Sequence, residues 1–211
     1  MLCCAGPAAK LIGMIRYAIT APLPGALDEV ATARLAGLAA RWAADGVDFV
    51  QLRQKQMSAG DLTALACRMI SAMGPGTQLL INHRADVALA SGAAGVHLTS
   101  HPGELTPADV RQLYGQAGEP EPVVSVSCHT LTDVERARDL GASLALFGPV
   151  FEKPVAASAS LPGVGLAVLR EACRVAGPLR VLALGGITTA NAPACMEAGA
   201  AGIAGIRLFE C

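Results

Sequence analysis

RVLALGGI (residues 180–187) and AGIAGIR (residues 201–207) are the two stretches that decide the fold. Each is a run of apolar, strand-forming residues that ends in glycine-rich backbone, and a short helix-like segment separates them. Glycine lets backbone N–H groups approach a bound anion closely, because it has no Cβ. In a (β/α)8 barrel, the loops after the seventh and eighth strands commonly bind phosphate. The two stretches therefore predict such a barrel with a phosphorylated small molecule as its ligand.

The expected phosphate site is mostly backbone at the ends of these two strands. Its residues are Gly185, Gly186, Gly205, Ile206 and Arg207. The Arg207 guanidinium adds a fixed positive fork, which suits an oxyanion that peptide N–H groups already contact.

The rest of the chain alternates apolar strands with amphipathic helical segments, the pattern of a parallel sheet with right-handed crossovers. The expected strands are 15–20, 48–53, 77–82, 94–98, 122–127, 143–148, 180–184 and 202–206. Eight strands and seven connecting helices predict a closed α/β TIM barrel. An open doubly wound sheet is the alternative, but no GxGxxG follows the first strand.

The ends of the chain set the expected domain boundaries. Residues 1–13 are interpreted as an N-terminal extension and residues 14–211 as a single barrel domain, with Met14 as an alternative start. Little sequence follows the eighth strand, so the last outer helix is expected to be missing. The apolar surface left there would need the extension or a second subunit to cover it, which predicts a homodimer.

Composition narrows the possible partners. The chain has 211 residues, of which 53% are hydrophobic, 16% charged and 3% aromatic, and its formal net charge is −1. Nucleic-acid binding is not expected, since it would require a basic stripe and stacking rings. No uninterrupted apolar run reaches the length of a membrane span. Seven scattered cysteines without a CxxC pair indicate reduced thiols and a cytoplasmic location.

Polar residues at strand ends are the candidates for ligand binding. Gln51, Arg53 and Lys55 have the same parity and therefore share one face of the second strand, while Asn82 ends the third. Polar side chains facing a barrel interior are expensive to bury without an anionic ligand or a charged partner. A salt bridge to a neighbouring carboxylate is the alternative interpretation.

Three residues on the next strands complete the candidate set. His97 ends the fourth strand, where a structural and a catalytic role are both open, and Ser127 ends the fifth. His129 follows at a helix N-terminus, where the positive field keeps an imidazole neutral, as a general base requires. A simple capping role for His129 is the alternative. Cys128 has the opposite strand parity to Ser127 and is expected in the core.

These motifs resemble the thiamine phosphate synthase and thiazole tautomerase superfamily. The matching segments are QLRQK (51–55), LINHRADVA (80–88), GVHL (95–98), SCH (127–129), LFGPVF (146–151) and LGGI (184–187). The resemblance implies a (β/α)8 barrel, commonly dimeric, that handles the phosphorylated thiazole half of thiamine and holds its phosphate after strands seven and eight.

The chain departs from the synthase pattern at three places that serve its magnesium and pyrophosphate. The synthase has Asn-Asp-Arg at residues 82–84, where this chain has His83 in the middle, and Gly-Gln-x-Asp at residues 99–102, where it ends in Pro102. A Thr-x-Thr-Lys loop corresponds to Lys-Pro-Val-Ala at 153–156. Magnesium prefers oxygen ligands, which His83 and Pro102 cannot supply.

The departures favour the tautomerase branch, which works without a metal or other cofactor. We expect an isomerase acting on a carboxythiazole phosphate, with His129 as the base, phosphate on the glycine-rich turns, and Arg53 or Lys55 on the substrate carboxylate. The alternatives are a thiamine phosphate synthase, joining hydroxymethylpyrimidine pyrophosphate to thiazole phosphate, and a non-catalytic regulator that binds thiazole phosphate.

Overall fold

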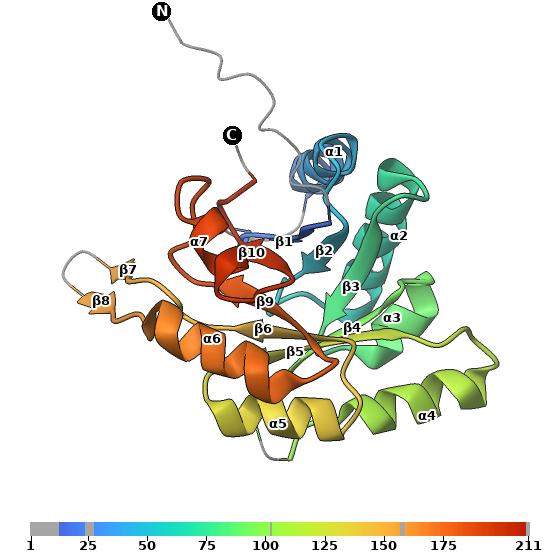
Figure 1. The fold of residues 1–211 in the computed structure, drawn as a ribbon. Helices are drawn as coiled ribbons and strands as arrows, with labels where there is room; N and C mark the ends of the chain where they lie inside the picture. Colours follow the sequence, from blue (N-terminus) through green and yellow to red (C-terminus); the bar gives the residue numbers. More distant parts are fainter. Residues whose placement is uncertain (1–12, 24–27, 102, 157–158, 210–211) are drawn as a thin grey trace, which may run out of the picture.

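Eight parallel strands close into a barrel in the computed structural model, which describes residues 13–23, 28–101, 103–156 and 159–209 (Figure 1). The order around the barrel is β1-β10-β9-β6-β5-β4-β3-β2. These strands are β1 (Ile15–Ile19), β2 (Phe49–Leu52), β3 (Gln78–Asn82), β4 (Gly95–Thr99), β5 (Val123–Cys128), β6 (Leu144–Phe147), β9 (Arg180–Leu184) and β10 (Gly202–Gly205). The eight predicted strands and the barrel class are confirmed, with boundaries that differ by at most one residue at either end.

Alternation along each strand separates two cores. On β5, Val124, Val126 and Cys128 pack outward against the helices, whereas Ser125 and Ser127 have the opposite parity. A smaller apolar cluster fills the barrel interior and includes Ile15, Tyr17, Ile19, Leu80, Leu144, Leu146, Leu182 and Ala204. The interior is therefore a packed core below a polar layer.

Helices surround the barrel on its outside, one after most strands (Figure 1). They are α1 (Glu29–Ala44), α2 (Ala59–Met73), α3 (Ala85–Ser91), α4 (Pro107–Ala117), α5 (Leu131–Asp139), α6 (Gly165–Ala176) and α7 (Ala192–Glu197). Asp28, Ser58, Thr106 and Thr130 cap the N-termini of α1, α2, α4 and α5 with their side chains. None of the described helices is both long and apolar enough to cross a membrane.

A two-stranded antiparallel hairpin is the main departure from the sequence prediction. β7 (Lys153–Ala156) and β8 (Ala159–Leu161) stand beside α6, away from the barrel wall (Figure 1), in a part of the chain where no strand was expected. β7 is short and contains Pro154, so its local sequence does not favour a strand. It becomes a strand because it pairs with the neighbouring β8.

The segment after β10 lies against the N-terminal part of the barrel. The Trp42 Nε1–H donates a hydrogen bond of 2.7 Å to the Phe209 carbonyl, and the Arg16 guanidinium lies 5.2 Å from the centre of the Phe209 ring. Residues 206–209 form no helix, as expected. The predicted extension, apart from Gly13, lies outside the described residues, and the homodimer stays a prediction.

Candidate active site

A cavity of about 820 Å³ opens at the carboxyl ends of the barrel strands. Its volume suits a small phosphorylated heterocycle, since ligand sites commonly measure roughly 300–1,000 Å³. It is lined by eleven of the twelve predicted site residues: Gln51, Arg53, Lys55, Asn82, His97, Ser127, Gly185, Gly186, Gly205, Ile206 and Arg207. His129 is the predicted residue that does not line it.

Strands β2 and β3 place an amide pair in the cavity wall. The Gln51 Nε2 amide donates a 2.8 Å hydrogen bond to Asn82 Oδ1 across the register that pairs these strands. Gln51 is 1% exposed, and its Oε1 is the one buried side-chain polar atom without a partner among the described residues. An unpartnered buried acceptor is uncommon, and this one belongs to a residue of the cavity wall.

The cavity is rich in positive charge. Arg53 and Lys55 follow β2, Arg207 follows β10, and none of the three forms an ion pair in the described part of the chain. The salt-bridge alternative for Arg53 and Lys55 therefore finds no partner in these residues. No carboxylate is among the lining residues. The lining favours a ligand that carries several negative charges.

Two consecutive glycines shape the turn after β9. Gly185 and Gly186 have φ angles of +91° and +64°, a left-handed conformation that side chains disfavour. A Cβ on Gly186 would lie 2.7 Å from the Glu152 carbonyl oxygen. The Asn191 side-chain amide donates a hydrogen bond of 3.0 Å to the Gly186 carbonyl and so stabilises the turn. Such a glycine turn is a suitable anion cradle.

His97 is buried between serines on β5. Its Nδ1 lies 2.9 Å from Ser125 Oγ and its Nε2 lies 2.9 Å from Ser127 Oγ. Burial, with smaller contributions from the positive charges of His83 and Arg53, lowers the His97 pKa to about 3. His97 is therefore neutral at physiological pH.

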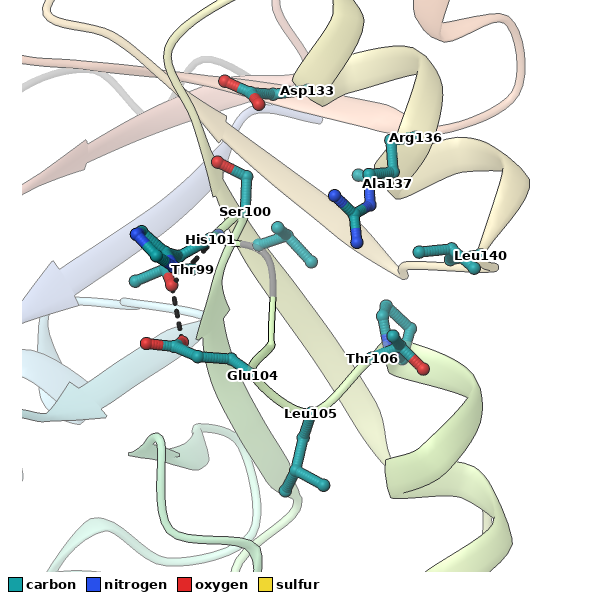
Figure 2. A pocket seen from close by; sticks show the side chains of 12 residues that line it. Thr99, Ser100, His101, Glu104, Leu105, Thr106, Asp133, Arg136, Ala137 and Leu140 are labelled. Atoms are coloured by element: carbon teal, nitrogen blue, oxygen red, sulfur yellow. Dashed lines mark hydrogen bonds between the residues drawn. The ribbon is translucent and has the colours of Figure 1, made fainter.

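Glu104 brings a carboxylate near the cavity from the loop after β4. Figure 2 shows its hydrogen bond with Thr99, whose hydroxyl donates to Glu104 Oε2 at 2.5 Å. His83 Nδ1 lies 3.1 Å from the same oxygen. The Thr99 hydrogen bond, more than the nearby histidines, holds the pKa of Glu104 below its usual range. His83 itself has a left-handed backbone, with φ of +61°.

This donor set does not fit a resident magnesium ion. Position 83 holds an imidazole that faces Glu104, and Pro102 lies outside the described residues. No group of three metal-binding side chains occurs within the described ranges. Magnesium is usually held by one or two carboxylates together with water and substrate phosphates, and the residues that line the cavity include no carboxylate.

A second, much smaller pocket lies between α4 and α5 (Figure 2). Its volume of about 20 Å³ leaves room for about one water molecule. Thr99 borders both this pocket and the large cavity. The small pocket therefore lies next to the site but is too small to hold part of a ligand.

His129 is exposed and lies just before α5. It is connected to the first turn of that helix by a hydrogen bond to Asp133. Its backbone N–H donates to Asp133 Oδ2 at 2.9 Å, and its Nδ1 lies 2.6 Å from the Gly148 carbonyl oxygen. A carbonyl only accepts, so Nδ1 carries the proton and the lone pair of the neutral ring is on Nε2. Cys128 is buried, as predicted, and burial raises the pKa of its thiol to about 12, which excludes an activated nucleophile.

Comparison with known proteins identifies the family. The profile of the family described as thiamine monophosphate synthase matches residues 17–209. The chain belongs to this family. A thiamine-phosphate synthase of Roseiflexus sp. (strain RS-1) is 36% identical over 198 residues, which cover 91% of this chain and 76% of the relative. A putative thiamine-phosphate synthase of Geobacter sulfurreducens is 42% identical over 163 residues, covering 76% and 72%.

A solved structure supports the same fold. A thiamine phosphate pyrophosphorylase from Pyrococcus furiosus superposes with a TM-score of 0.70 over 92% of this chain and 86% of its own, at 23% identity. Membership of the thiamine monophosphate synthase family places the chain in thiamine biosynthesis and confirms the predicted superfamily. The names of these relatives agree with the alternative prediction, a synthase, and not with the tautomerase.

Among the lining residues with a hydroxyl side chain, three were not singled out as site residues: Thr99, Thr188 and Thr189. Thr188 and Thr189 follow the Gly185-Gly186 turn directly, so their position after the predicted phosphate stretch was the available signal. Thr99 gave no such signal, because its contact with Glu104 depends on how the loop after β4 folds back.

Proposed function

We propose that this family member is a metal-independent, thiazole tautomerase-like isomerase acting on a carboxythiazole phosphate. The observation that carries the proposal is a cavity lined by three cationic side chains and no carboxylate. A phosphate and a carboxylate on one ligand carry about three negative charges, which the three cations can balance.

The substrates of the synthase reaction would bring more negative charge into the same cavity. A thiazole phosphate together with a pyrophosphate ester carries roughly five negative charges. Magnesium normally offsets part of that charge, and the lining has no carboxylate to hold the ion. The charge of the cavity wall therefore supports the smaller, carboxylate-bearing ligand.

Different residues bind the phosphate, orient the carboxylate and transfer the proton in the proposed reaction. The glycine turn after β9 and Arg207 bind the phosphate, while Arg53 and Lys55 orient the carboxylate. His129 lies outside the cavity lining, so the proposal requires the reacting ring carbon to be bound at the edge of the cavity, within reach of Nε2. There Nε2 takes a proton from the ring carbon, the ring electrons shift to form the aromatic thiazole, and the exocyclic carbon receives a proton. The Gly148 carbonyl keeps Nδ1 protonated and so leaves Nε2 basic. A positioned base of this kind contributes about 10²–10⁴-fold.

Deuterium exchange tests the proposal. The protein, treated with EDTA, is incubated with the exocyclic tautomer of carboxythiazole phosphate in D2O, and NMR follows deuterium entering the exocyclic carbon. We expect turnover without added metal and a loss of about 10²–10⁴-fold in His129→Asn, with unchanged affinity for inorganic phosphate. Binding without turnover would instead make the protein a ligand-binding regulator.

The names of the relatives favour a second candidate, a thiamine phosphate synthase. The same preparation is given thiazole phosphate, hydroxymethylpyrimidine pyrophosphate and magnesium. Formation of thiamine phosphate, with no exchange in the first assay, would replace the isomerase proposal with the synthase.

A further inference from the structure

A chain of four polar side chains connects the buried barrel interior with the cavity. The Tyr17 hydroxyl lies 3.0 Å from Ser125 Oγ and 3.5 Å from His97 Nδ1. Ser125 Oγ lies 2.9 Å from His97 Nδ1, and His97 Nε2 lies 2.9 Å from Ser127 Oγ, which lines the cavity. Tyr17 belongs to β1 and the serines to β5, so barrel closure brings the chain together.

Each member of this chain contributes one hydrogen at neutral pH. Burial lowers the His97 pKa to about 3, so its ring carries a single N–H. Burial also raises the pKa of Tyr17, so its hydroxyl stays protonated. Four hydrogens serve three links in series, and one hydrogen must therefore be left over.

The position of the leftover hydrogen depends on the tautomer of His97. If Tyr17 donates to Ser125, Ser125 donates to Nδ1 and Nε2–H donates to Ser127, the spare hydrogen belongs to Ser127 and faces the cavity. The other tautomer, in which Nδ1–H donates to Ser125 or Tyr17, leaves the hydrogen of one of these two hydroxyls without an acceptor, and both side chains are 0% exposed. Leaving such a buried donor unpaired disfavours this tautomer by about 5- to 150-fold.

We propose that Tyr17 and Ser125 act as positioning residues that hold His97 in its Nε2–H tautomer, so that Ser127 is a hydrogen-bond donor to the ligand. The atom of the ligand at Ser127 is then an acceptor, such as a ring nitrogen or a carboxylate oxygen. A ligand that presents an amino group there is disfavoured, because its N–H would meet the Ser127 hydrogen. The proposal rests on the proposed function only for the identity of the ligand.

The first test reads the tautomer directly, without any substrate. Protein labelled with ¹⁵N-histidine is examined by NMR at pH 7.5, where the two ring nitrogens of each tautomer have distinct chemical shifts. We expect His97 to be neutral and protonated on Nε2. A proton on Nδ1, or an even mixture of tautomers, would overturn the proposal whatever reaction the protein performs.

The second test removes the two buried donors together, because either hydroxyl alone can still donate to Nδ1. The double variant Tyr17→Phe/Ser125→Ala should release the tautomer, and the Nδ1–H form should become visible. Tyr114→Phe is the matched control: it also deletes a buried tyrosine hydroxyl, one that donates to the Ala93 carbonyl, and should leave the His97 spectrum unchanged. A double variant whose His97 tautomer is unchanged would show that these residues do not hold it.

Calorimetry then tests the effect on binding. In Ser127→Ala and in the double variant, affinity for the phosphorylated thiazole half of thiamine should fall by about 2- to 12-fold, the effect of one hydrogen bond. Affinity for inorganic phosphate should not change, since its site is the glycine turn. Equal losses for both ligands would indicate a general distortion of the barrel and would overturn the assignment of Ser127 as the ligand donor.

Discussion

Acid should weaken the native state in part through His97, because this ring is neutral when folded and titrates normally when unfolded. Burial lowers its pKa to about 3, against an ordinary value of about 6.5. Between these values the unfolded chain binds one proton more than the folded chain, so stability falls as the pH drops from about 6.5 towards 3. At 1.36 kcal/mol per pH unit, moving from pH 7 to pH 5 should cost about 2 kcal/mol.

Urea unfolding at pH 7 and pH 5 measures this cost. Other groups also titrate, so the informative quantity is the difference between the native protein and His97→Gln, which lacks the titrating ring. We expect the native protein to lose about 2 kcal/mol more than the variant over this interval. Tyr114→Phe serves as a control for destabilisation alone, because tyrosine does not titrate in this range. Equal losses in native protein and His97→Gln would refute the argument.

Three further substitutions test the framework of the site. Gly95→Ala would place a Cβ 1.9 Å from the Val123 carbonyl oxygen on the neighbouring strand. Urea unfolding should therefore show that the free energy of unfolding falls by about 3 kcal/mol or more. A loss below about 1 kcal/mol would mean that β4 and β5 can move apart freely. Gly186→Ala should weaken inorganic phosphate binding about tenfold in calorimetry, because the turn after β9 must shift, and an unchanged affinity would argue against a phosphate site there. Thr106→Ala removes the N-cap of α4 and its reciprocal contact with Asp109, for an expected cost of about 1 kcal/mol; a stability within error of the native protein would count against that cap.

Much of the site follows from strand parity and strand ends. Side chains alternate along a strand, so Gln51, Arg53 and Lys55 could be assigned to one face before any coordinates were known, and all three line the cavity. The glycines at the ends of β9 and β10 were recognisable because glycine, without a Cβ, lets backbone N–H groups approach an anion closely. These are local properties, and local sequence suffices to predict them.

The sequence by itself determined the eight strands, their parallel arrangement and the stretches that meet at one end of the barrel. The tertiary structure alone decided which side chains touch. Tyr17 meets Ser125 over 108 residues of sequence, Glu104 folds back onto Thr99, and His129 is left outside the cavity lining. Alternation and propensity report how each segment folds, but contact between segments depends on strand register and on closure of β1 against β10, which no local pattern encodes.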